Sequence, residues 1–150
     1  MAVVNETLAA LRIGGDALDP AEVTRLLGHA PSLAQTKGQE IGRNSAGEPH
    51  FAKIGQWQLE ASNRSPGDLD AQIDEILSQL SDDLAVWSAL TSQYEADLFC
   101  GLLLQVSDEG LTLSPKSLAA LGSRGIELGL CIYSGKAETP NTSLERTRGE

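Results

Sequence analysis

Carboxylate side chains are concentrated in the middle of the chain, where residues 68–83 contain six acids and no basic residue. They are Asp68, Asp70, Asp74, Glu75, Asp82 and Asp83. Asp70 and Asp74 lie one turn apart on an expected helix, so their charges repel mildly. This region is either a solvated helical face, favoured at its start by the helix dipole, or a docking face for a basic protein partner. The second interpretation makes Asp70, Asp74 and Asp82 candidate binding residues.

A second candidate site combines a long loop with an aromatic residue. Residues 30–50 are rich in Gly, Pro and polar residues, and a structureless stretch of this length is often functional. Lys37 and Arg43 lie within it and could fix a small anionic ligand on an otherwise acidic protein. Trp57 would then form the wall of a pocket under loop 32–50. The alternative is that Trp57 is an ordinary core aromatic.

Catalytic and metal-binding patterns are weak in this chain. His29 and His50, the only histidines, could act as a base or a metal ligand beside Asp16 or Glu48. They fit equally a helix C-terminal turn and a loop. The sequence holds no phosphate-binding loop, GxGxxG, HExxH or GxSxG motif. We therefore expect no catalytic residue, no metal and no cofactor, and favour a non-catalytic binding protein.

The charge balance excludes several classes of partner. The 150-residue chain has 11 Lys and Arg against 21 Asp and Glu, a net charge of −10. Nucleic acids and anionic membranes are bound by clustered basic residues, so neither is an expected partner. The N-terminus lacks the basic region of a secretory signal, and the longest apolar run, residues 98–104, is far shorter than the about 20 residues that span a membrane. These features predict a cytoplasmic protein.

The two cysteines, Cys100 and Cys131, both lie in apolar segments. We expect two reduced, buried thiols. A disulfide would require their strands to be neighbours. No CxxC spacing or histidine companion indicates a metal pair.

Periodicity predicts a single α+β domain. Alternating polarity predicts strands, listed here in chain order: residues 6–13, 51–61, 94–106, a short strand at 111–113, and 126–133. Helical spacing or capping predicts helices, in the same order: residues 20–27, 69–80, a turn or helix from 84, and 117–121. This order favours a mostly antiparallel sheet over residues 1–134 with helices packed mainly on one face.

Individual residues make these expectations specific. Asp19 and Pro20 begin a helix, with Glu22 at the capping-box position, and Gly28 ends it. Residues 6–13 could instead form a short helix capped by Asn5, although strand alternation is favoured. Further expected core positions are Phe51, Trp57 and Leu59 on one strand face, and Leu84, Trp87 and Leu90 on a helix. On the last strand Ile126, Leu128, Leu130 and Ile132 alternate with the residues between them.

Several short motifs carry a resemblance to a known family. They are residues 14–20 (GGDALDP), 26–31 (LLGHAP), 37–38 (KG), 55–59 (GQWQL) and 126–133 (IELGLCIY). With them, residues 5–134 resemble the bacterial domain-of-unknown-function family numbered four-two-seven-nine. That family has no established activity, so the resemblance implies no catalytic residues.

The last sixteen residues, 135–150, differ in character from the rest of the chain. They contain one large apolar residue, Leu144, and no periodicity, which predicts a flexible tail. Residues 140–148 resemble the read-through end of proteins encoded on mobile integron gene cassettes.

Two roles remain open from the sequence. The first is an immunity-type protein that binds a basic partner through its acidic helical region. The second is a small-molecule-binding protein with a pocket under loop 32–50. A homodimer through an uncovered sheet edge fits either role.

Overall fold

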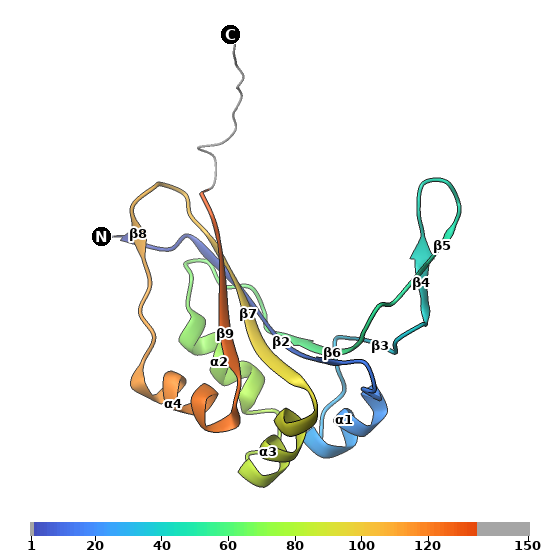
Figure 1. Cartoon of the computed structure of the whole chain (residues 1–150). Coiled ribbons are helices and arrows are strands. Elements are labelled where there is room, and N and C mark those ends of the chain that lie inside the picture. The colour runs from blue at the N-terminus through green and yellow to red at the C-terminus, as the bar shows by residue number, and fades with distance from the viewer. Residues whose placement is uncertain (1, 135–150) are drawn as a thin grey trace.

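A five-stranded sheet with strand order β3-β6-β2-β7-β9 forms the centre of the protein (Figure 1). The computed structural model describes residues 2–134. The strands of this sheet are β2 (Glu6–Gly15), β3 (Leu33–Gln35), β6 (Gly55–Glu60), β7 (Glu95–Leu103) and β9 (Glu127–Tyr133). Neighbouring strands are antiparallel except for β7 and β9, which are parallel. The prediction of a mostly antiparallel sheet is confirmed.

Strand β2 is central because one face of it is uniformly apolar or small. Its alternate residues Thr7, Ala9, Leu11 and Ile13 are all buried. The intervening residues, such as Arg12, point to the opposite face of the sheet, as strand geometry requires. The prediction that residues 6–13 form a strand is confirmed, and these residues do not form the alternative short helix.

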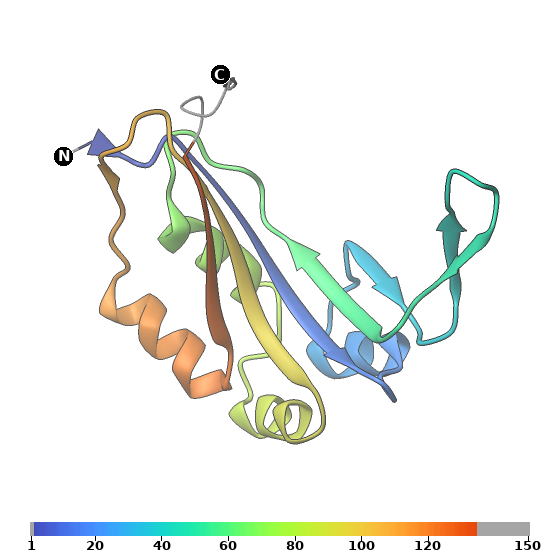
Figure 2. The same ribbon diagram turned by 45° about the horizontal axis from the view of Figure 1, so that its top comes forward.

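The four helices of residues 2–134 cover the same face of the sheet, and these residues leave the other face open (Figure 2). They are α1 (Pro20–Leu27), α2 (Leu69–Leu77), α3 (Leu84–Gln93) and α4 (Pro115–Arg124). Together with the sheet they form a single α+β domain, as the periodicity predicted. Within residues 2–134, no helix has both the length and the apolar character needed to cross a membrane.

Helix α1 begins and ends where the sequence predicted. The Asp19 side chain accepts a hydrogen bond from the Ala21 N–H, and Gly28 ends the helix at φ 83°, a left-handed conformation that glycine adopts without steric cost. The capping-box expectation for Glu22 is wrong, because its carboxylate pairs with Arg25 one turn later.

The core lies between the sheet and the helices. Trp57 and Leu59 on β6, and Trp87 and Leu90 on α3, are buried as expected. Leu84 is 49% exposed, so its expected inward position is wrong. It is the first residue of α3, directly after the N-cap Asp83, and this end of the helix lies at the surface.

A buried polar network joins α2 to the central strand. The Thr7 hydroxyl donates to Gln72 Oε1 at 2.7 Å and accepts the Asp68 N–H at 3.0 Å. Gln72 Nε2 donates to the carbonyls of Thr7 and Ser62, both at 2.9 Å. Each buried polar atom of the two side chains is therefore paired, as stable interiors require.

The expectation of a long loop over residues 30–50 is wrong. Strand β3 joins the edge of the main sheet, and β4 (Glu40–Arg43) and β5 (Pro49–Phe51) form an antiparallel hairpin that projects from the body (Figure 1). Its polar residues form the turn, where Asn44 Oδ1 accepts the N–H groups of Ala46 and Glu48 and Gly47 has φ 82°. Phe51, expected in the core, is 50% exposed on this arm.

Two boundaries in the C-terminal half also differ from expectation. No strand forms over residues 111–113; the short strand is β8 (Glu109–Gly110), which pairs in parallel with β1 (Ala2–Val3). Helix α4 is longer than expected. It continues through Gly122, which is exposed and meets no close neighbour, and ends at Gly125.

The last strand, β9, keeps the expected alternation, but most of its apolar side chains are not buried. Ile126 is buried just before it, whereas Leu130 and Ile132 are more than half exposed. The reason is that β9 lies at the edge of the sheet, beyond the cover of α4 (Figure 2). The predicted tail, residues 135–150, lies outside the described residues.

Candidate functional site

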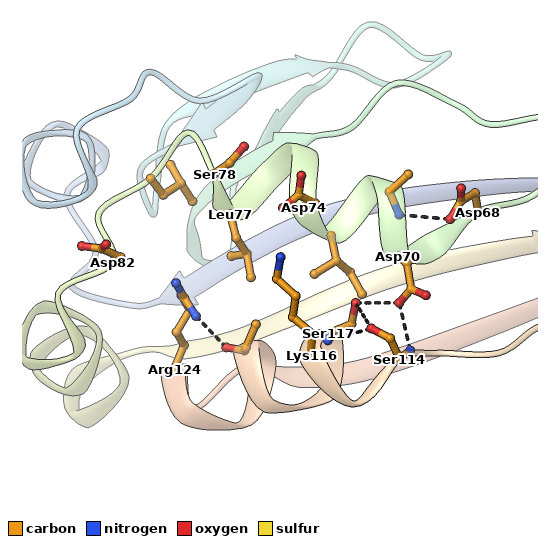
Figure 3. A pocket seen from close by; sticks show the side chains of 14 residues that line it. Asp68, Asp70, Asp74, Leu77, Ser78, Asp82, Ser114, Lys116, Ser117 and Arg124 are labelled. Carbon is orange, nitrogen blue, oxygen red and sulfur yellow. Dashed lines mark hydrogen bonds between the residues drawn. The ribbon is translucent and has the colours of Figure 1, made fainter.

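A cleft of about 680 Å³ lies between helices α2 and α4. Its lining combines charged side chains from both helices with an apolar floor (Figure 3). Ile73, Leu77 and Leu80 supply that floor and are themselves part of the core. The volume is within the range of about 300–1,000 Å³ typical of ligand pockets.

The α2 side of the cleft carries two carboxylates that are available for binding. Asp74 lies on α2 and Asp82 on the segment that follows it. Within residues 2–134, neither side chain makes a hydrogen bond or an ion pair. Both were candidate binding residues from the sequence, and the fold brings them to one cleft.

Asp70, the third acidic candidate, also lines the cleft but is engaged in holding α4. Its Oδ1 accepts the Ser117 hydroxyl at 2.6 Å and the Ser114 N–H at 3.1 Å (Figure 3). These hydrogen bonds favour the ionised form and lower the pKa of Asp70, the Ser117 bond contributing most. Ser114 is the N-cap of α4, so Asp70 fixes the start of that helix against α2.

The α4 side of the cleft is basic, which the sequence interpretation missed. Lys116 points toward α2 and has no ion-pair partner among the described residues (Figure 3). Arg124 donates to the Ala120 carbonyl at 3.0 Å, and its guanidinium lies 6.0 Å from the centre of the Trp87 ring. Its Nε atom is buried without a hydrogen-bond partner in the described part of the chain. The cleft therefore has one acidic and one basic side.

The other acids of residues 68–83 have structural partners. Asp68 and Asp83 are the N-caps of α2 and α3, where they accept backbone N–H groups. Glu75 accepts the Ser62 N–H at 2.9 Å and lies 3.8 Å from Arg64. The six carboxylates thus do not form one continuous docking face, because most of them secure local structure.

The residues of the second candidate site do not come together. Trp57 is fully buried, on the helix-covered side of the sheet, and its indole N–H donates to Thr24 at 3.0 Å. Lys37 pairs with Asp16 at 3.2 Å, and Arg43 at the hairpin turn donates to the Gly47 carbonyl. The α2–α4 cleft and the hollows on the open sheet face are lined by other residues.

An ion pair between Arg12 and Asp97 lies on the open face of the sheet. Arg12 and Asp97 form two hydrogen bonds of 2.9 and 2.7 Å, and the guanidinium lies 4.6 Å from the centre of the Phe99 ring. Hydrogen bonding to Asp97 raises the pKa of Arg12. Glu95 and Glu127 line the same shallow hollow of about 480 Å³. Because its one base is already paired, this hollow offers less to a ligand than the cleft does.

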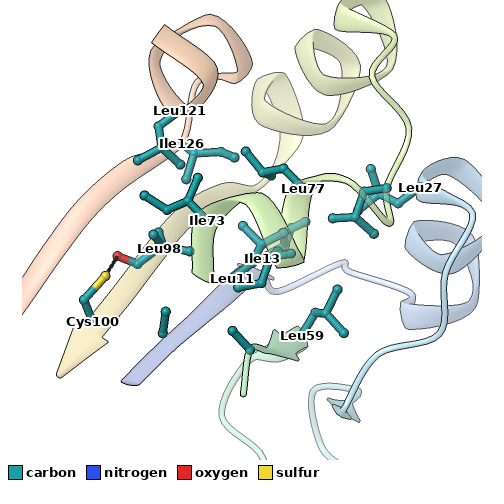
Figure 4. Close-up of a cluster of buried hydrophobic side chains, with 14 of the residues drawn as sticks. Leu11, Ile13, Leu27, Leu59, Ile73, Leu77, Leu98, Cys100, Leu121 and Ile126 are labelled. Atoms are coloured by element: carbon teal, nitrogen blue, oxygen red, sulfur yellow. Dashed lines mark hydrogen bonds between the residues drawn. The ribbon is translucent and has the colours of Figure 1, made fainter. Parts of the chain in front are cut away.

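The two cysteines are free thiols that do not face each other. Strands β7 and β9 are neighbours, but Cys100 is opposite Leu130 and Cys131 is opposite Gly101, so the two thiols point to opposite faces and are free. Figure 4 shows Cys100 at the border of the core, where burial raises its pKa to about 12. Within residues 2–134, no three His, Cys, Asp or Glu side chains are placed to hold a metal ion.

Residues 5–135 match a protein family described as "Domain of unknown function (DUF4279)". The match spans the sheet, all four helices and the cleft between α2 and α4. It agrees with the resemblance drawn from the glycine- and proline-containing motifs. Neither a curated protein nor a solved structure matches the chain.

Proposed function

We propose that this chain, which belongs to the DUF4279 family, is a non-catalytic binding protein whose α2–α4 cleft receives a basic segment of a partner protein. The observation that carries the proposal is the pair of unengaged carboxylates, Asp74 and Asp82, at the edge of an apolar floor. An immunity-type protein that neutralises a basic toxin is the kind of role that this chemistry suits.

The shape of the cleft suits a lysine or arginine side chain of the partner. Such a side chain has an apolar stem and a charged head, and it binds best where the stem contacts apolar surface and the head meets a carboxylate. Ile73, Leu77 and Leu80 provide the apolar surface, and Asp74 and Asp82 provide the carboxylates. The net charge of −10 would accelerate encounter with a basic partner.

The basic side of the cleft favours an occupant that also has a hydrogen-bond acceptor. Lys116 has no ion pair, and the buried Nε–H of Arg124 has no acceptor, among the described residues. An arriving carbonyl or carboxylate could pair with the exposed ammonium group of Lys116. A peptide segment supplies both a cationic side chain and backbone carbonyls.

Binding of a small molecule is the second candidate, and the same cleft supports it better than loop 32–50 does. Lys116 and Arg124 could hold an anionic group while Asp74 or Asp82 holds a cationic one. The volume of the cleft is that of a small-molecule pocket. Native mass spectrometry of the purified protein separates the two candidates by the mass of what is bound.

The test compares two double variants with the same change in net charge. Asp74→Lys/Asp82→Lys alters the cleft, and Glu95→Lys/Asp108→Lys alters exposed acids outside it that also form no ion pair among the described residues. Each tagged protein is used for affinity capture from its bacterial host, and captured proteins are identified and titrated. We expect a basic partner to bind the wild type and the control variant, and to bind the cleft variant at least about tenfold more weakly.

Two results would refute this function. Equal weakening in both double variants would show that only net charge matters. Capture of no basic protein by the wild type, with no binding of Arg- and Lys-containing test peptides, would leave the cleft without its proposed occupant. Circular dichroism of each variant checks that the fold is retained.

A bacterial, cassette-encoded origin and a cytoplasmic location belong to the same proposal. The support for the origin is the resemblance of residues 140–148 to cassette read-through ends.

A further inference from the structure

The last strand, β9, presents an unpaired edge. It is hydrogen-bonded to β7 on one side only, in parallel register. The Leu104 N–H donates to the Tyr133 carbonyl at 2.9 Å, so Tyr133 and the alternate residues before it direct their backbone groups toward β7. Leu128, Leu130 and Ile132 therefore direct their N–H and C=O groups outward. Among residues 2–134, no strand pairs with that edge.

The side chains along this edge are apolar and uncovered. Leu121 and Ile126 are buried where α4 packs against the beginning of β9 (Figure 4). Farther along the strand, Leu130 is 51% and Ile132 is 62% exposed, and Leu118 of α4 is 51% exposed. These three side chains line one apolar hollow. Burying these apolar side chains against a partner would be favourable. An exposed apolar edge strand is a template for pairing with another strand.

We infer that two copies of this chain pair antiparallel through β9, about a twofold axis at Leu130. In this register Leu130 is opposite its own copy, and Leu128 is opposite Ile132 in both directions. These are the residues whose backbone groups point outward, so each pair exchanges two hydrogen bonds. Shifting the axis by one residue in either direction reduces the number of such pairs within Glu127–Tyr133.

The composition of β9 fits a second copy better than a charged partner. Residues 128–133 contain no ionisable acid or base other than Cys131 and Tyr133, although the whole chain has a net charge of −10. Two copies can therefore meet at this edge without facing rows of like charge. In the same register, Glu127 lies opposite the second copy's Tyr133 on the open face, where the phenol can donate to the carboxylate. By symmetry this contact forms twice.

The pairing would join two five-stranded sheets into one continuous sheet. The side chains of Leu128, Leu130 and Ile132 from both copies would then form a single apolar row on the helix-covered face. The interface does not include Asp74 or Asp82. An experiment can therefore refute the dimer without refuting the proposed binding function, and the reverse.

Sedimentation equilibrium tests the dimer directly. We expect the wild type to have twice the chain mass of 15.9 kDa and Leu130→Lys to have the mass of one chain. Ile41→Lys is the matched control, because Ile41 is also an exposed apolar strand residue but lies on the projecting hairpin. It should remain dimeric. A monomeric wild type, or a dimeric Leu130→Lys, would overturn the inference.

Disulfide trapping tests the register, and it does not depend on the folding of Leu130→Lys. In a Cys131→Ser background, Leu130→Cys places two thiols directly opposite each other, with Cα atoms about 5.5 Å apart, which suits a disulfide. Leu128→Cys in the same background places them four residues out of register, at about 13 Å along the strand. We expect oxidation to crosslink only the first variant. No crosslink at position 130, or equal crosslinking at 128, would overturn the pairing.

Discussion

Replacing Asp70 should remove the hydrogen bonds between α2 and the start of α4 and so lower the stability of the protein. It tests which acids of the cleft stabilise the fold. In the wild type one oxygen of this carboxylate accepts the Ser117 hydroxyl and the Ser114 N–H. Asp70→Ala removes both acceptor contacts at the start of α4. Asp74→Ala is the matched control, because it removes a carboxylate one turn away that has no partner in the described chain.

The hydrogen bonds set the expected magnitude. A hydrogen bond to a charged group contributes about 1.5–3 kcal/mol when well shielded. Asp70 is only partly buried, so solvent screening reduces this contribution. We expect Asp70→Ala to lower the free energy of unfolding by about 2 kcal/mol, and Asp74→Ala to change it by less than about 0.5 kcal/mol.

The pH dependence gives an independent check on the cause. The pKa of Asp70 is lowered in the folded protein, so the carboxylate stabilises the fold above the unfolded-state pKa of about 4. This stabilisation is lost as pH falls through the folded-state pKa. Urea unfolding followed by circular dichroism should show a wild-type advantage over Asp70→Asn that is full near neutral pH and shrinks in acid. Equal stability of Asp70→Ala and wild type, or equal losses for Asp70→Ala and Asp74→Ala, would refute the assignment.

Three further predictions follow from the fold. Thr7→Val leaves the buried Gln72 Oε1 without a donor, so the free energy of unfolding in urea should fall by about 1–3 kcal/mol. The control Thr112→Val, at an exposed position, should change it by less than about 0.5 kcal/mol. The pKa of Cys100, raised to about 12 by burial, should keep this thiol unmodified by iodoacetamide at about pH 8 in the folded protein, and mass spectrometry should detect modification only after unfolding. Replacing the exposed residues 41–50 with an Asn-Gly turn should change the free energy of unfolding by less than about 1 kcal/mol in the urea assay; a larger loss would show that the hairpin stabilises the core.

Local patterns in the sequence were sufficient for most elements. The alternation of residues 6–13 predicted the central strand, because a strand with one buried face must alternate apolar and polar residues. The Asp-Pro start and the Gly28 end predicted α1, because the first and last turns of a helix need these groups. The same kind of reasoning failed for residues 30–50. Their Gly, Pro and Asn residues are typical of loops, but here Asn44 and Gly47 form the turn of a hairpin, and Gly42 and Pro49 lie within its strands.

The candidate site shows the same division between local and distant information. The sequence identified Asp70, Asp74 and Asp82 as a group because they lie close together along the chain. It could not show that α4 lies beside α2, because Asp70 and Ser117 are 47 residues apart and nothing in either segment specifies the other. Lys116 and Arg124 were therefore missed, and Trp57 was linked to a site when its indole is part of the core.

The sequence by itself determined the acidity of this protein, its α+β class and the ends of several helices, since these depend on composition and on contacts within a few residues. Only the tertiary structure decided which acids form hydrogen bonds or ion pairs, which basic residues face them and which strand edge has no neighbouring strand. Those properties depend on how segments far apart in the chain pack, and a side chain becomes a structural anchor or an available ligand only through its neighbours in space.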